Sequence, residues 1–310
     1  MFLSLKDVRK EFDNKVAVDD LSLEVPRGII YGIIGPNGAG KTTTIRMIMD
    51  ITAPDSGSIL FEGKPRRPDF KNHVGYLPEE RGLYKKMTLR DIIVYLAELK
   101  GVAPAKTRPK IAPWLERVGL ADYSDKKVEE LSKGMQQKLQ FVTTIIHDPD
   151  LIVLDELFSG LDPLNMELMK DIILDLKRAG KTVLFSTHVM EQAEKLCDNI
   201  CMIANGKKVL DGRLTDVRAR FGKNSVQLDI DGDGHFIRSL PGVGDVNEFS
   251  NYLELQLLDN ADSNALLMAI AQKVTIRRFD IVEPSLYDIF IDMAKIDPSE
   301  LDKPGEERHV

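Results

Sequence analysis

One short loop, Gly35 to Thr43, constrains the fold of this chain more than any other feature. Its sequence GPNGAGKTT matches the phosphate-binding pattern G-x-x-x-x-G-K-[ST]. The residues before the loop form a short apolar run typical of a buried strand, and those after it place apolar side chains at helical spacing. A glycine-rich turn without a ligand is the alternative, which the lysine and threonine of the pattern disfavour. The stretch therefore predicts a nucleotide-phosphate site between a strand and a helix.

The residue types of this loop suit the binding of phosphate oxygens. Glycines allow backbone N–H groups to approach an anion closely, and the N-terminus of the following helix adds a positive dipole end. Lys41 would reach the β- and γ-phosphates, and the Thr42 hydroxyl would bind Mg²⁺. The residues that we expect to contact the nucleotide here are Gly35, Pro36, Asn37, Gly38, Ala39, Gly40, Lys41, Thr42 and Thr43.

Length and composition narrow the class of protein. The chain has 310 residues, which is typical of two domains, and its 43% hydrophobic residues suit ordinary globular cores. Its net charge of -7 argues against a large nucleic-acid footprint, which is normally basic. No apolar run reaches the roughly 18 residues of a membrane-spanning helix, so we expect a cytoplasmic protein. Cys197 and Cys201 match no metal or redox spacing, and we expect both to be core residues.

Apolar spacing predicts a helical block between two regions in which strands and helices alternate. The continuous run Leu151–Leu154 is typical of a central parallel strand, and Asn205-Gly206 is a strong hairpin signal. The expected elements are strands at residues 3–8, 21–25, 58–61, 72–77, 151–154 and 182–186, a polar turn at 10–13, helices at 88–100, 110–118 and 132–146, and a strand pair at 200–204 and 207–210.

Two carboxylates end the strand predicted at Leu151–Leu154. Asp155 would hold Mg²⁺ directly or through water if it faces the phosphate loop. The adjacent Glu156 is suited to polarise a water for in-line attack on the γ-phosphate. The alternative is that acidic residues simply end a strand in solvent, which the phosphate loop in the same chain disfavours.

Three further motifs follow in an order that resembles the ATP-binding-cassette (ABC) ATPases. Leu131–Lys138, with sequence LSKGMQQK, looks like their signature motif and stands just before Asp155-Glu156. Ser159–Asp162 resembles their D-loop, and Ser186–His188 resembles the segment that carries their switch histidine. With the phosphate loop and the strand ending at Asp155, five motifs in order cover residues 1 to about 220.

The resemblance implies a dimer in which two copies bind ATP head to tail. Ser132 and Gly134 would then contact the γ-phosphate held by the partner chain, and Asp162 would bridge the two protomers. Taken alone, Ser132 is only a helix N-cap. Phe12 would stack on adenine, its alternative being a half-exposed aromatic residue near a strand end. His188 would bond the γ-phosphate and, with Glu156, orient the attacking water. The expected catalytic residues are therefore Glu156, His188 and Lys41.

The chain departs from the usual family pattern at two places. Glu79 follows the strand that ends at Pro78, where the family usually has glutamine. A carboxylate also ligates Mg²⁺, so we expect Thr42, Glu79 and Asp155 to bind the metal. Whether the extra negative charge changes the metal affinity or the coupling of hydrolysis to movement stays open. Lys133 and Met135 replace the usual residues of the signature, and whether Lys133 adds a cation near the phosphates or faces solvent also stays open.

The resemblance implies an α/β fold with two domains. Residues 1–222 would form the P-loop cassette, with a RecA-like parallel-sheet core, an antiparallel β subdomain and a helical subdomain at about 84–146. Residues 223–296 would form a small C-terminal α+β domain, followed by a polar tail at 297–310.

The stretches Leu77–Tyr84 and Glu283–Phe290 resemble a bacterial subfamily associated with export of sodium ions or drugs. Membership implies an ATP-hydrolysing subunit that works as a homodimer and lies on the inner face of the cell membrane through a separate permease. The segment after Glu79, with Leu83 and Tyr84, would receive that permease, the alternative being an ordinary surface loop with two half-buried residues. A cytosolic cassette ATPase acting on ribosomes or DNA is the alternative function. The cargo, the role of the C-terminal domain and whether the dimer is homo- or heteromeric do not follow from the sequence.

Overall fold

The computed structural model describes residues 1–13, 15–80, 82–221, 225–249, 251–258, 261–282 and 284–294. Contacts between residues divide the chain into an N-terminal unit, Met1–Arg213, and a second unit that begins at Leu214. Two domain boundaries were expected, at residues 222–223 and 296–297, and both lie outside the described residues. The expected polar tail at 297–310 also lies outside them. The two units are therefore described separately.

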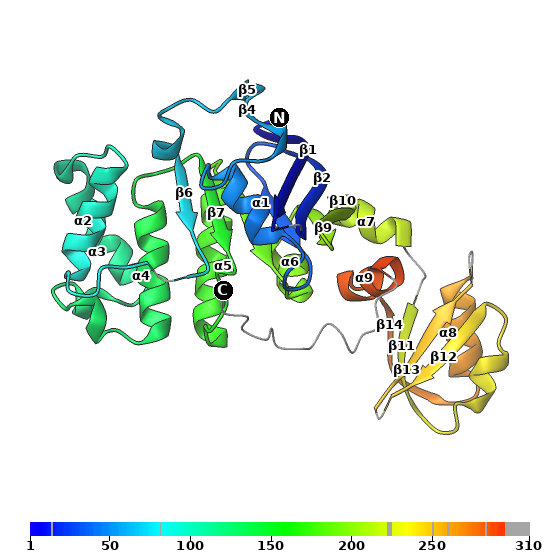
Figure 1. The fold of residues 1–310 in the computed structure, drawn as a ribbon. Helices are drawn as coiled ribbons and strands as arrows, with labels where there is room; N and C mark the ends of the chain where they lie inside the picture. The colour runs from blue at the N-terminus through cyan, green and yellow to red at the C-terminus, as the bar shows by residue number, and fades with distance from the viewer. Residues whose placement is uncertain are drawn as a thin grey trace. The chain divides into compact units, whose positions relative to one another are not determined.

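A six-stranded sheet forms the centre of the N-terminal unit (Figure 1), with strand order β10-β9-β3-β8-β7-β6. Neighbouring strands from β9 to β6 are parallel, and β10 is antiparallel to β9. The predicted hairpin is confirmed, because Asn205 and Gly206 both have the positive φ that its tight turn requires. The strands are β3 (Ile30–Ile34), β6 (Val74–Leu77), β7 (Leu151–Asp155), β8 (Thr182–Thr187), β9 (Asn199–Ala204) and β10 (Lys207–Arg213).

An antiparallel sheet with order β2-β1-β4-β5 lies beside this core. The polar turn predicted at Lys10–Asp13 is wrong, because β1 continues to Phe12 and pairs with β2. Asp55 supports this polar end of β1, accepting from Lys10 Nζ and from Glu11 N, each at 2.7 Å. The strands are β1 (Leu3–Phe12), β2 (Lys15–Val25), β4 (Ser56–Phe61) and β5 (Lys64–Pro65).

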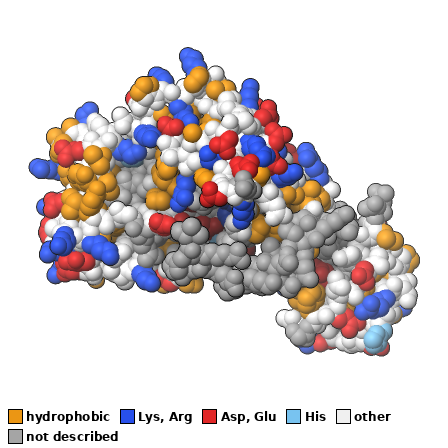
Figure 2. Space-filling model, in the orientation of Figure 1, with side chains coloured by type: hydrophobic (Ala, Val, Ile, Leu, Met, Phe, Trp, Pro, Cys, Tyr) orange, Lys and Arg blue, Asp and Glu red, His pale blue; other side chains and the backbone are white. Residues whose placement is uncertain are grey.

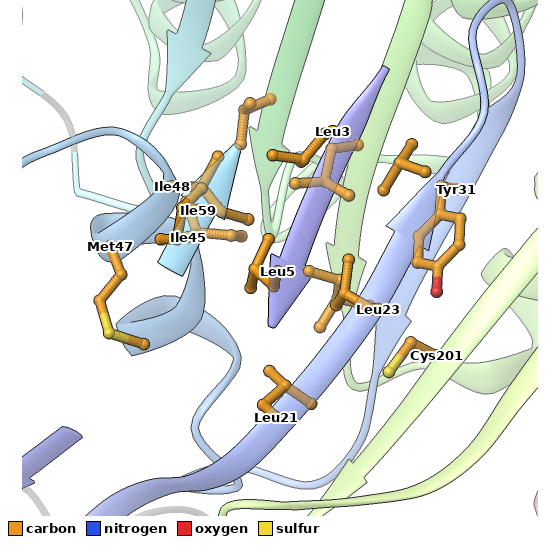
Figure 3. Packing of buried hydrophobic residues seen from close by; sticks show 14 of the residues in the cluster. Leu3, Leu5, Leu21, Leu23, Tyr31, Ile45, Met47, Ile48, Ile59 and Cys201 are labelled. Atoms are coloured by element: carbon orange, nitrogen blue, oxygen red, sulfur yellow. The ribbon is translucent and has the colours of Figure 1, made fainter. Parts of the chain in front are cut away.

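The main hydrophobic core joins the two sheets to helix α1 (Lys41–Ile48). Figure 3 shows Leu5 of β1 with Ile45 and Ile48 of this helix on one side and Leu23 of β2 on the other. Cys201 belongs to the same cluster, and both cysteines are buried and free, as predicted. Packing in this core thus fixes helix α1, which begins where the phosphate loop ends.

The predicted helical block is confirmed, but its second helix begins earlier than predicted. Helix α3 starts at Pro104 instead of residue 110, and Pro109 and Pro113 lie inside it. Its inward face buries Thr107, Ile111 and Leu115, so tertiary packing outweighs the cost of the prolines. The α-helices after α1 are α2 (Leu89–Leu99), α3 (Pro104–Arg117), α4 (Lys133–Ile145), α5 (Pro163–Arg178) and α6 (Met190–Leu196), with 3₁₀ turns at Phe70–Asn72, Ala121–Tyr123 and Val128–Glu130.

The C-terminal unit contains an antiparallel sheet with order β12-β13-β11-β14. From β11 on, its succession of strand, 3₁₀ helix, two strands, α-helix and strand resembles the ferredoxin-like β-α-β-β-α-β arrangement, with a 3₁₀ helix in place of the first α-helix. The small α+β fold predicted for this part of the chain is confirmed. No helix in the described residues is long and apolar enough to cross a membrane. The elements are α7 (Leu214–Phe221), β11 (Ser225–Asp231), a 3₁₀ helix (His235–Ser239), β12 (Val243–Glu248), β13 (Leu253–Leu257), α8 (Ser263–Ala271), β14 (Thr275–Val282) and α9 (Leu286–Ala294).

Candidate active site

The phosphate loop connects the end of β3 to the start of α1, as the sequence predicts. Gly35 and Gly40 have φ values of 150° and 106°, in the region that favours glycine. A Cβ atom at Gly35 would lie 2.1 Å from the Ile203 carbonyl oxygen, and one at Gly40 would lie 2.4 Å from the Ala17 carbonyl oxygen. The glycines are therefore required by both the backbone conformation and the space available.

Lys41 is buried at the first position of α1, with only 6% of its surface exposed. Its Nζ donates to the carbonyl oxygens of Gly35 at 2.8 Å and Pro36 at 3.2 Å. The same atom lies 3.5 Å from Glu156 Oε1. Burial lowers the pKa of the Lys41 ammonium, and the nearby Glu156 carboxylate acts in the opposite direction. A fixed cation thus lies inside the loop.

Asp155 ends strand β7 and is fully buried. Its Oδ1 accepts a hydrogen bond from Ser186 Oγ on the neighbouring strand β8. Its Oδ2 has no hydrogen-bond partner among the described residues. Burial raises the pKa of Asp155, while the hydrogen bond from Ser186 and then the nearby Thr42 hydroxyl oppose that shift. A buried carboxylate oxygen beside the Thr42 hydroxyl is suited to a cation.

Glu156 follows in the left-handed region with a φ of 51°, an unusual conformation for a residue with a side chain. Its backbone N–H donates to the Ser186 carbonyl at 3.2 Å. Its Oε2 lies 3.0 Å from His188 Nδ1. The His188 side chain is 45% exposed, whereas Glu156 is nearly buried. The strand end therefore brings Lys41, Glu156 and His188 together, as the motifs predict.

A cavity of about 490 Å³ opens over the phosphate loop. Phe12, Lys41, Glu79 and Glu156 line it together with several residues of the loop. Phe12 is 47% exposed, so a flat ligand can reach its ring, over which Lys10 Nζ lies 5.2 Å from the centroid. Burial, followed by the charges of Asp155 and Glu156, raises the pKa of the Glu79 carboxyl. Glu79 thus shares the electrostatic environment of the two strand-end carboxylates.

Ser132, Gly134 and Asp162 do not line this cavity. Ser132 is the N-cap of α4, where its Oγ accepts from Met135 N at 3.3 Å. Asp162 is the N-cap of α5, where its Oδ1 accepts from Asn165 N at 3.0 Å. Ser132 and Asp162 therefore cap helices within this chain. Their expected role toward a partner's nucleotide stays a prediction.

Sequence reasoning missed the role of Ser186. Its hydroxyl donates to Asp155 Oδ1 and also accepts from Glu156 N at 3.3 Å. One residue of β8 therefore bonds the Asp155 carboxylate and the backbone of Glu156. The Ser-Thr-His motif drew attention to this segment only for its histidine. Lys15 of β2 was also missed, and it lines the cavity near Phe12.

The donor set fits a magnesium ion that is bound mainly by phosphates and water. No cluster of three or more His, Cys, Asp or Glu side chains that could hold a metal occurs among the described residues. Mg²⁺ at nucleotide sites needs only one or two protein oxygens, because it keeps waters and binds phosphate oxygens. The free Asp155 Oδ2 and the Thr42 hydroxyl supply such oxygens, and Glu79 lies at the edge of the same region.

Comparisons with known proteins agree with this geometry. A family model described as ABC transporter matches residues 18–159, and a model of the C-terminal domain of DrrA1-3-like ATP-binding proteins matches residues 212–294. The chain is 45% identical over 290 residues to an uncharacterized ABC transporter ATP-binding protein, YhaQ, of Bacillus subtilis. That match covers 94% of this chain and 97% of the relative.

Two further matches each cover about two thirds or more of this chain. The Nod factor export ATP-binding protein I of Burkholderia pseudomallei is 40% identical over 213 residues, which is 68% of this chain and 70% of the relative. A solved ATP-binding subunit of an ABC transporter is 32% identical with a TM-score of 0.67, over 72% of this chain and 94% of that chain. The chain therefore belongs to the ATP-hydrolysing, ATP-binding proteins of ABC transporters.

Proposed function

We propose that this chain powers a membrane exporter by hydrolysing ATP in the cavity over the phosphate loop. The observation that carries the proposal is the constellation of Lys41, Glu156 and His188 around that cavity. A buried cation, a carboxylate and an imidazole meet at the point where the γ-phosphate of a nucleotide bound by the loop would lie.

The proposed reaction is attack of water on the γ-phosphorus, which yields ADP and inorganic phosphate. Glu156 orients and polarises the water through its carboxylate, and His188 holds that carboxylate and bonds the γ-phosphate. Lys41 and the backbone N–H groups of the loop stabilise the developing charge. Bound Mg²⁺, held by Thr42 and Asp155 with Glu79, would supply further positive charge to the phosphate oxygens.

We propose that two copies complete two such sites. Ser132 and Gly134 lie at the N-terminus of α4, where free backbone N–H groups suit an anion, and they are absent from the cavity of their own chain. A head-to-tail partner would bring them to the γ-phosphate and Asp162 toward the partner's loop. ATP binding would then close the homodimer, and hydrolysis would open it.

An export role is supported by the relatives. One relative is named for Nod factor export, and the C-terminal domain matches the model of DrrA1-3-like proteins. We infer an exporter of the sodium or drug type, held by its permease at the inner face of the membrane. Figure 2 shows basic and acidic side chains intermingled over the face in view, which does not favour the alternative of a nucleic-acid or ribosome partner.

Purification of the tagged chain from detergent-solubilised membranes of its host tests this proposal. We expect a polytopic membrane protein in stoichiometric amount, retained more strongly with ATP and the slowly hydrolysing variant Glu156→Gln. The matched control is Lys41→Ala, which should lose the ATP-dependent gain but not the ATP-independent association. Ribosomal proteins without any membrane partner would instead support the alternative function and refute the exporter.

A further inference from the structure

A turn from Glu156 to Asp162 connects the proposed catalytic carboxylate to the N-cap of α5. Helix α4 packs against this segment through its second turn. The Gln137 side chain is 3% exposed, and its Nε2 donates to the Leu157 carbonyl oxygen at 3.0 Å. That carbonyl belongs to the residue that directly follows Glu156. A buried side-chain amide thus fixes the peptide next to Glu156.

The position of Glu156 depends on such contacts because its backbone is held at a φ of 51°. Residues with side chains occupy this region only when the surrounding structure holds them there. On the N-terminal side, Ser186 supplies the acceptor for Glu156 N. On the C-terminal side, the bond from Gln137 fixes the following residue. The two anchors come from different elements, strand β8 and helix α4.

The same helix carries the residues expected to meet the partner's nucleotide. Ser132 is the N-cap of α4, and Gly134 lies in its first turn, one turn before Gln137. A Cβ atom at Gly134 would lie 3.9 Å from Leu161 Cδ2, so the first turn also touches the far end of the segment. Lys138 is buried, and the charge of Asp162 acts on its ammonium. Helix α4 therefore contacts the segment near both of its ends.

We propose that Gln137 is a positioning residue that connects the signature end of α4 to Glu156 of the same chain. A shift of α4 when Ser132 and Gly134 engage the partner's nucleotide would pull on the Leu157 carbonyl and move Glu156 into line. Each nucleotide site would thereby control hydrolysis at the other. This inference rests on the proposed role of Glu156 in hydrolysis.

The test uses full-length protein and compares steady-state ATP hydrolysis and nucleotide affinity. Gln137→Met keeps the side-chain volume and removes the donor, so kcat should fall about tenfold while the affinity for a fluorescent ATP analogue stays within about twofold. The Hill coefficient for ATP should fall toward one. The control, Thr143→Val, removes a buried hydroxyl of α4 whose one hydrogen bond among the described residues stays within the helix, to Gln140 O at 2.7 Å, and it should keep parental kcat and Hill coefficient.

Gln137→Glu provides a second readout if the methionine variant folds poorly. A neutral carboxyl can donate to the Leu157 carbonyl, and a carboxylate cannot, so the ratio of variant to parental kcat should rise from about pH 8 to about pH 6. Parental kcat in Gln137→Met, or a flat ratio in Gln137→Glu, would overturn the inference. Glu156→Gln separates the two claims. If it hydrolyses ATP at the parental rate, the proposed role of Glu156 fails, and if it does not while Gln137→Met does, only the role of Gln137 fails.

Discussion

Replacing Ser186 by alanine tests whether one hydroxyl stabilises the buried Asp155 carboxylate. The change removes the donor to Asp155 Oδ1 in a region with no exposure to solvent, and Asp155 Oδ2 already lacks a hydrogen-bond partner among the described residues. A hydrogen bond to a charged group contributes about 1.5–3 kcal/mol, so Ser186→Ala should lower the free energy of unfolding by about 2 kcal/mol. For a unit of this size, that loss corresponds to a Tm decrease of roughly 4–8 °C.

Thermal and urea unfolding without nucleotide or metal measures the effect, and a matched control lies at the other end of the same strand. Thr182 is fully buried, and its Oγ1 accepts from Gly28 N at 2.9 Å, a bond between neutral groups. Thr182→Val should therefore cost only about 1 kcal/mol. In the Asp155→Asn background, Ser186→Ala should also cost about 1 kcal/mol, because the acceptor is no longer charged. An equal cost of Ser186→Ala in both backgrounds would refute the reasoning.

Three further predictions concern residues of the same candidate active site. Asp155→Asn should stabilise the metal-free chain at neutral pH, because burial raises the pKa of Asp155 and its ionisation therefore opposes folding. This gain in the free energy of unfolding, measured by urea titration, should shrink as pH falls through that raised pKa, and a gain that stays constant with pH would contradict the prediction. Phe12→Ala should weaken binding of a fluorescent ATP analogue about tenfold if the exposed ring stacks on adenine, whereas Phe12→Tyr should retain parental affinity. Glu79→Gln should raise the Mg²⁺ concentration needed for half-maximal nucleotide binding, and an unchanged requirement would remove Glu79 from the metal site.

The features predicted best from the sequence are those set by contiguous residues. The phosphate loop carries its glycines, lysine and threonine at fixed spacing, so local backbone geometry and chemistry appear in one stretch. The buried strand before Asp155 and the hairpin at Asn205 followed from their local sequence, whereas the order of strands within the sheet did not. The cassette and the small C-terminal fold followed from the resemblance of the motifs to the ABC ATPases.

The features that were missed depend on residues far apart in the chain. Ser186 meets Asp155 across 31 positions, and nothing in its local sequence indicates which carboxylate its hydroxyl would reach. Asp55 supports Lys10 across 45 positions, so the polar end of β1 was predicted to be a turn. Helix α3 contains prolines whose cost is offset by packing against the helical block, which local propensity does not contain.

The central claim is that Glu156 drives hydrolysis of ATP held between two copies of this chain. The most direct measurement follows ATP hydrolysis and oligomeric state of Glu156→Gln beside the parent, with Mg²⁺ and ATP, by phosphate release and size-exclusion chromatography. We expect phosphate release to fall at least a hundredfold in the variant, and an ATP-dependent dimer to persist in the variant but to be transient in the parent. Parental turnover by Glu156→Gln, or a variant that stays monomeric with ATP, would contradict the central claim.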